Sequence, residues 1–211
     1  MKTDDLIEML ARNAGPAPRV PIAWRLMPVM VLGFMTSSLL ALLVIGPLPL
    51  AVFQTSAPWI KLFYALLLTS AAYVLTARLA RPIARLQAAH AAVLSVIAAM
   101  VLFGAVALGL TPRGERWETV LGETWLMCPF LLMGFSLPSL AGILWAVKGL
   151  APTQPKRAGG ACGLLAGAIG AAGYSLACPE SSVTFVAIWY TIGIGFTALL
   201  GRALGHQWLR W

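Results

Sequence analysis

The chain has 211 residues, of which 60% are hydrophobic and only 10% are charged. Soluble domains carry about 25% charged residues, so this composition excludes an ordinary water-soluble fold and predicts a lipid bilayer as the solvent. The net charge of +8 would suggest nucleic-acid binding in a soluble protein. Here the basic residues stand in short segments beside apolar runs, so we expect no nucleic-acid partner.

Six apolar segments are each close to the ~20 residues that a helix needs to cross the hydrocarbon core of a membrane. In chain order they cover residues 26–46, 59–77, 88–110, 124–147, 158–177 and 183–204. None of them alternates between polar and apolar residues as the strands of a β-barrel do. We therefore predict an all-α, polytopic membrane protein, with an arm over residues 1–25 and six transmembrane helices within residues 26–211.

Lysine and arginine predict how these helices are oriented, because cytoplasmic loops are enriched in both. Twelve of the 15 basic residues fall in the arm, the second and fourth loops or the C-terminal tail. The other three, Lys61, Arg113 and Arg116, fall on the opposite side. We therefore expect both termini in the cytoplasm, and the first, third and fifth loops outside the inner membrane.

The fifth segment carries a stripe of glycines, Gly159, Gly163 and Gly167, which repeat every four residues on one face of a helix. Small residues on such a face let a neighbouring helix approach closely. That neighbour is either another helix of the same chain or a second copy of the protein. The stripe therefore leaves a homo-oligomer open.

Ionisable side chains are rare inside the predicted helices. Lys61 and His90 lie near helix ends, where their side chains can reach the membrane surface, and no Asp or Glu lies within a span. Ion-coupled transport needs charged groups at depth, and no catalytic or phosphate-binding motif is present. We predict that the protein is not an enzyme. A small-solute transporter or channel and a structural subunit of a membrane complex are the alternatives to a regulatory role.

Two of the three cysteines fall on the outer side of the predicted membrane. Cys128 comes at the start of the fourth segment and Cys178 at the end of the fifth, each followed by proline, whereas Cys162 lies at the cytoplasmic end. The pair has three interpretations: packing side chains, a reversible disulfide that senses oxidants, or a soft-metal site to which Glu180 adds an oxygen ligand. We expect no resident cofactor, and at most transient binding of a soft metal as a signal.

The N-terminal arm has the pattern of a short amphipathic helix. Asp4 and Asp5 lie in its first turn, where the helix dipole favours acidic residues. An apolar stripe is formed by Leu6, Ile7, Met9 and Leu10. So short a helix is marginal alone and becomes ordered by docking on a partner protein. A helix lying on the membrane surface is the alternative, although its acidic polar face disfavours that location.

Motifs spread along the whole chain resemble one known family. The chain opens with Met1, Lys2, Thr3, Asp4 and Asp5, carries Cys128-Pro129 and Cys178-Pro179-Glu180, and closes with Leu209, Arg210 and Trp211. Together with six spans in 211 residues, this combination resembles the NrsF-type anti-sigma factors. The resemblance implies a bacterial inner-membrane protein that holds an extracytoplasmic-function sigma factor inactive and releases it under heavy-metal or oxidative stress.

The same resemblance implies roles for particular residues. Cys128 and Cys178 correspond to the sensing pair, by oxidation or metal binding. Cys162 has no counterpart in sensing and is assigned to packing. The arm corresponds to the element that grips the sigma factor, through Asp4, Asp5, Leu6, Ile7 and Leu10.

Overall fold

A computed structural model of the chain describes residues 3, 5, 7–9, 22–81, 85–150 and 152–209. Within these ranges the regular structure is helical and no strand occurs, so the all-α prediction is confirmed for the described residues. The long helices are α2 (Ile22–Val44), α3 (Ala57–Leu79), α4 (Gln87–Leu110), α6 (Cys128–Lys148), α7 (Pro155–Tyr174) and α9 (Thr191–Trp208). The short elements are η1 (Leu50–Gln54), α5 (Arg116–Leu121), α8 (Val183–Phe185) and the π-helical turn η2 (Val186–Tyr190).

All six predicted segments are helices, but only five of the described helices are long and apolar enough to cross a membrane. These are α2, α3, α4, α6 and the continuous run Val183–Trp208, which joins α8, η2 and α9. Helix α7 is 20 residues long but rich in glycine and alanine, and is therefore less apolar than the others. The described residues thus contain six long helical segments, five of which qualify as membrane spans, and the prediction that all six cross the membrane stays a prediction.

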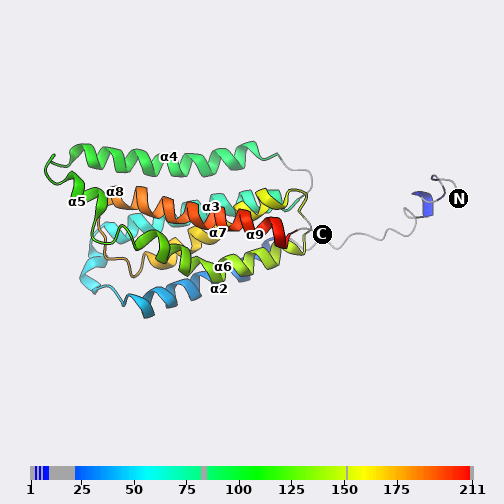
Figure 1. Cartoon of the computed structure of the whole chain (residues 1–211), viewed down its shortest axis with the longest axis horizontal. Helices are drawn as coiled ribbons and strands as arrows, with labels where there is room; N and C mark the ends of the chain where they lie inside the picture. The colour runs from blue at the N-terminus through cyan, green and yellow to red at the C-terminus, as the bar shows by residue number, and fades with distance from the viewer. Residues whose placement is uncertain are drawn as a thin grey trace.

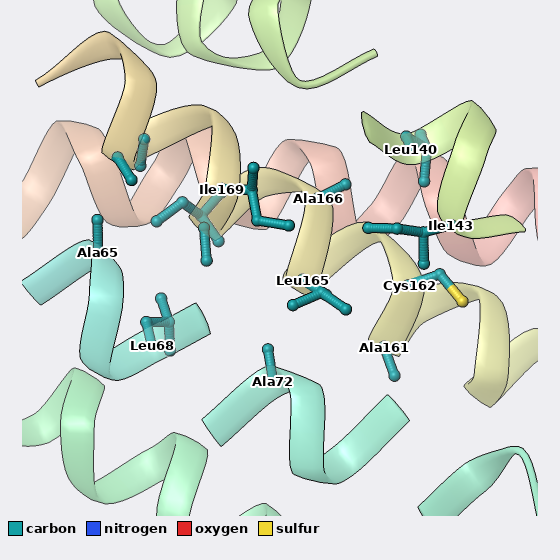
Figure 2. Close-up of a cluster of buried hydrophobic side chains, with 14 of the residues drawn as sticks. Ala65, Leu68, Ala72, Leu140, Ile143, Ala161, Cys162, Leu165, Ala166 and Ile169 are labelled. Carbon is teal, nitrogen blue, oxygen red and sulfur yellow. The ribbon is translucent and has the colours of Figure 1, made fainter. Parts of the chain in front are cut away.

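The composition of α7 reflects its place at the centre of the bundle, where it contacts α2, α3, α6 and α9 (Figure 1). Most of its side chains are buried, and Leu165 and Ala166 are completely so. Figure 2 shows side chains of α3, such as Leu68, and of α6, such as Ile143, gathered around it. Because other helices of the protein surround α7, small side chains are favoured over large apolar ones, since they let these helices pack closely against it.

The glycine stripe of α7 packs against α9 within the same chain. A Cβ atom at Gly159 would lie 2.7 Å from the Cα atom of Gly205, and one at Gly163 would lie 2.8 Å from the Cα atom of Ala198. Gly201 meets the stripe from α9, where its own Cβ would lie 2.7 Å from the Cα atom of Gly163. The interpretation of the stripe as intramolecular packing is confirmed, and this face is not available to a second copy.

The two ends of the bundle carry different charge. One end holds η1, α5 and the turn after α7, and the other holds the α3–α4 and α6–α7 connections and the end of α9 (Figure 1). Among the described residues, the second end, here called the basic end, carries no acidic side chain and eight cations: Arg25, Arg78, Arg81, Arg85, Lys148, Lys156, Arg157 and Arg202. The first end, here called the acidic end, carries Glu115, Glu118, Glu123 and Glu180 with Lys61, Arg113 and Arg116.

The start of α2 lies earlier than predicted. The helix begins at Ile22, so the predicted boundary after residue 25 falls inside its second turn. Ile22 and Leu26 are one helical turn apart and both are buried in the core, while the Arg25 side chain donates to the carbonyl oxygen of Gly149 at 3.4 Å. The packing of Ile22 and the Arg25 hydrogen bond stabilise an additional helical turn on the N-terminal side of the predicted apolar segment.

We expect Gly163→Ala to lower the free energy of unfolding by about 1–3 kcal/mol, because the added methyl group overlaps the backbone of α9 at Ala198. Unfolding in detergent micelles, followed by tryptophan fluorescence, measures the change. Gly134→Ala in α6 is the matched control, since its Cβ meets nothing within 4 Å and alanine favours the helix by up to about 1 kcal/mol. Equal effects of the two substitutions would contradict the close α7–α9 contact.

Candidate functional site

Two cysteines share one buried site at the acidic end. Cys128 is the first residue of α6, Cys178 follows α7, and both are completely buried free thiols. The side chain of Tyr174 interacts with both sulfur atoms, and the two cysteines interact electrostatically with each other. Cys162 lies apart in the core, beside Ile143 (Figure 2). Cys128 and Cys178 therefore lie at the same site and Cys162 lies apart from it, while their roles in sensing or packing stay predictions.

A buried lysine lies against this pair. Lys61, in the second turn of α3, is 1% exposed, and its Nζ atom donates to the carbonyl oxygen of Cys178 at 2.8 Å. A cation just beyond the C-terminus of α7 is also favoured by the helix dipole. The expectation that the Lys61 side chain reaches the surface is wrong, because the side chain is buried and bonded to the turn that follows α7. The one signal in the sequence was a lone charge within an apolar segment.

Glu180 ties the two cysteine-bearing segments together. Its Oε1 atom accepts hydrogen bonds from the backbone N–H groups of Glu123 (2.8 Å) and Thr124 (2.9 Å), and from the Thr124 hydroxyl (2.9 Å). The Thr124 carbonyl in turn accepts from the N–H of Cys128 at 2.8 Å. We call this arrangement the Glu180 clasp. It fixes the turn that follows Cys178 to the segment that leads into α6.

Gly122 makes the close approach of the clasp feasible. Its φ of +57° lies in the left-handed region, which glycine adopts without strain. A Cβ atom here would also lie 2.6 Å from Oε2 of Glu180 and 2.7 Å from the Phe185 ring. Both the turn and the space therefore require glycine at this position.

Two further hydrogen bonds join the same segments. The Ser182 hydroxyl donates to the Thr119 carbonyl at 2.8 Å, and Nε1 of Trp189 donates to the Val120 carbonyl at 2.9 Å. The Trp189 ring also packs on Trp125, with ring centroids 5.4 Å apart. The acidic end is therefore held together by side chains of the Glu180–Trp189 region that reach across to the segment before α6.

Tyrosines line the inner side of the cysteine pair. The ring centroids of Tyr174 and Tyr190 lie 5.5 Å apart. Tyr190 also interacts electrostatically with both cysteines. Tyr190 comes from the π-helical turn η2, a feature frequently found at functional sites. Its hydroxyl is buried and interacts with the Cys178 side chain.

The metal interpretation of the pair has a smaller ligand set than the sequence suggested. Among the described residues, no group of three or more His, Cys, Asp and Glu side chains is placed to hold a metal ion. One Glu180 oxygen already accepts three hydrogen bonds. A soft metal would find the thiols of Cys128 and Cys178 here, and would engage that oxygen only by breaking the Glu180 clasp.

The predicted sigma-binding arm is described only in part. Asp5 and Ile7 are helical and exposed, as are Thr3, Glu8 and Met9. Asp4, Leu6 and Leu10 lie outside the described residues. The exposure of Ile7, at 60%, leaves at least one apolar side chain of this helix available to a partner.

Comparisons with known proteins agree on one family. Residues 10–211 match the family model "NrsF: Negative regulator of sigma F". The chain is 36% identical over 214 residues to the probable anti-sigma-F factor NrsF of Azospira oryzae, and 36% identical over 220 residues to the anti-sigma-F factor NrsF of Caulobacter vibrioides. Both alignments cover the full length of this chain and of the relative. No solved structure matches the chain.

We expect Glu180→Ala to speed the labelling of Cys128 and Cys178 by a small maleimide about tenfold, because loss of the clasp favours opening of the acidic end. Hydrogen bonds to a charged acceptor contribute about 1.5–3 kcal/mol, and the lower value applies to a partly buried carboxylate. Mass spectrometry of the Cys162→Ala background measures both rates. Glu123→Ala removes a neighbouring exposed carboxylate without removing the clasp, and an equal acceleration there would refute this account.

Proposed function

This chain belongs to the NrsF family, the negative regulators of sigma F, and on that premise we propose that it acts from the bacterial inner membrane, gripping its sigma factor with the N-terminal arm and releasing it when the cysteine pair reacts. Membership makes the chain an anti-sigma factor, a regulatory protein rather than an enzyme. It also disfavours the alternatives of a solute transporter and a structural subunit. An extracytoplasmic-function sigma factor is the partner that we propose.

Placement in the membrane is supported by helix length and charge. Five of the described helices have the length and apolar composition of membrane spans, and α7 runs between the same two ends of the bundle (Figure 1). We therefore infer six crossings, with α7 enclosed by the others. The basic end lies in the cytoplasm on the positive-inside rule, so the arm and the sigma factor share one compartment.

The arm is supported as the sigma-binding element by its pattern. A short helix with an apolar stripe and acidic residues in its first turn docks in grooves of partner proteins and is only marginally stable alone. Both curated relatives align with the whole chain, the arm included. Asp5 and Ile7 are exposed, and Asp4, Leu6 and Leu10 complete the proposed contact.

The observation that carries the sensing proposal is the shared site of Cys128 and Cys178. Cys128 is the first residue of α6 and Cys178 lies in the turn after α7, so a bond between them would link these two segments. Reaction with a hydroperoxide would convert the two thiols to a disulfide, while the peroxide is reduced to an alcohol and water. A soft metal ion would instead displace two protons and bridge the two sulfur atoms. Either product would pull the start of α6 toward the end of α7.

The coupling to the cytoplasm follows from packing. Helices α6 and α7 pack along each other and are joined by residues 149–154 at the basic end. Close-packed helices move as rigid bodies rather than deforming locally, so a tilt at the acidic end displaces this connection. In this arrangement the basic end faces the sigma factor. We propose that the displacement of the α6–α7 connection there leads to release of the sigma factor.

The arm is tested with the full-length protein in detergent. We expect Asp5→Lys with Leu6→Asp to weaken binding to the host's sigma factor F by about 30-fold or more, because removal of an anchoring side chain from an interface costs about 2 kcal/mol. Surface-immobilised protein and purified sigma factor give the dissociation constant. Glu118→Lys with Leu126→Asp makes the same changes at exposed positions of the acidic end. If both variants bind like the native protein, the arm does not hold the sigma factor.

The cysteine pair is tested in cells. We expect Cys128→Ser with Cys178→Ser to abolish induction of a sigma-F-dependent reporter by cadmium or hypochlorite, while repression without stress persists. Serine cannot form a disulfide or bind soft metals well, yet it nearly preserves the packing volume. Cys162→Ser is the control and should respond normally. Normal induction in the double variant would remove the pair from the mechanism and leave the arm's role intact.

A further inference from the structure

A groove opens at the basic end and is lined by α3, α7 and α9, with His90 as its lining residue from α4. It has a volume of about 780 Å³, and its apolar walls include Leu79 of α3, Leu164 of α7 and Phe196 of α9. A second hollow of about 600 Å³ adjoins it. Three cations line both hollows: Lys156, Arg157 and Arg202. We call the two together the α4–α9 groove.

The groove exists because α4 is held mainly by α3 and by the acidic end. Near that end α4 contacts α8 and η2, and the Thr184 hydroxyl donates to the Gly104 carbonyl at 3.0 Å. From there α4 and α9 diverge toward the basic end (Figure 1). Gly195 lies in the apolar part of the groove, and a Cβ atom there would meet nothing within 4 Å. The groove therefore has unfilled space beside an apolar wall.

The charged end of the groove lacks a counter-ion within the described chain. Neither hollow is lined by Asp or Glu, and Lys156, Arg157 and Arg202 are all exposed. Lys156 and Arg157 stand in the first turn of α7, where the helix dipole disfavours cations. Gln154, the N-cap residue, makes no side-chain capping hydrogen bond. Three cations and the open amide groups of a helix N-terminus together form an environment that favours an anion.

We propose that the α4–α9 groove binds an anionic phospholipid, with its phosphate on Arg157, Arg202 and Lys156 and an acyl chain along Phe196 and Leu164. An anionic headgroup supplies the charge that the basic residues lack, and an acyl chain fits an apolar groove between spans. Basic pockets between membrane helices bind such headgroups in this way. The inference rests on the proposed membrane placement and not on sigma-factor binding.

The test uses the full-length protein in detergent and adds phosphatidylglycerol, phosphatidylcholine or inorganic phosphate. We expect phosphatidylglycerol to raise the Tm and to remain bound in native mass spectrometry, and the other two to do neither. Arg157→Gln with Arg202→Gln should weaken phosphatidylglycerol binding about 30-fold, given the usual attraction per basic residue. Arg81→Gln with Lys148→Gln, which removes two exposed cations of the basic end outside the groove, should leave it unchanged.

A second pair of variants tests the acyl-chain part and does not depend on the charges. Gly195→Leu should fill the groove and reduce phosphatidylglycerol binding, whereas Gly134→Leu, at an equally open position of α6, should not. Equal binding of phosphatidylcholine, or an equal Tm shift with inorganic phosphate, would overturn the proposal. So would phosphatidylglycerol binding that appears only after deletion of residues 2–20, because the acidic arm would then be the occupant.

Discussion

The contact between the backbones of α7 and α9 determines how the other helices are arranged. Lipid tails are as apolar as leucine, so membrane helices associate by close packing rather than by hydrophobic burial. The glycines of α7 and α9, Gly163 and Gly201 among them, let these two helices touch at their backbones, and α2, α3 and α6 then close around α7. The end of α7, with Tyr174 and the turn to Cys178, is thereby placed beside the start of α6.

The acidic end has a different kind of order. Polar side chains hold its turns, with the Glu180 carboxylate, the Ser182 hydroxyl and the Trp189 indole all bonded to backbone groups of the segment before α6. Lys61 of α3 donates a further hydrogen bond, to the Cys178 carbonyl. The bundle thus combines a packed middle with a hydrogen-bonded end. In the proposed mechanism, reaction of Cys128 and Cys178 rearranges the hydrogen-bonded end and not the packed middle.

Hydropathy and charge were enough to predict the helices, and to predict that Cys128 and Cys178 lie at the same end of the bundle. Both predictions depend on local composition. Hydropathy and charge were not enough to predict side-chain partners. Glu180 resembled a metal ligand beside Cys178, whereas its acceptor role depends on N–H groups 56 and 57 residues earlier in the chain. Likewise, an apolar segment does not reveal whether lipid or protein surrounds it, so the enclosed position of α7 could not be predicted.

Complete burial of both thiols has a kinetic consequence for a sensor of this design. When a protein recloses faster than a reagent attacks, the observed rate is the product of the opening equilibrium and the intrinsic reaction rate. The pair would then accumulate modification slowly and ignore brief pulses of oxidant. Bulky disulfides such as that of glutathione would be excluded, whereas small uncharged oxidants would enter. The response would follow sustained exposure to reagents small enough to enter the opened site, rather than the redox poise of the surrounding water.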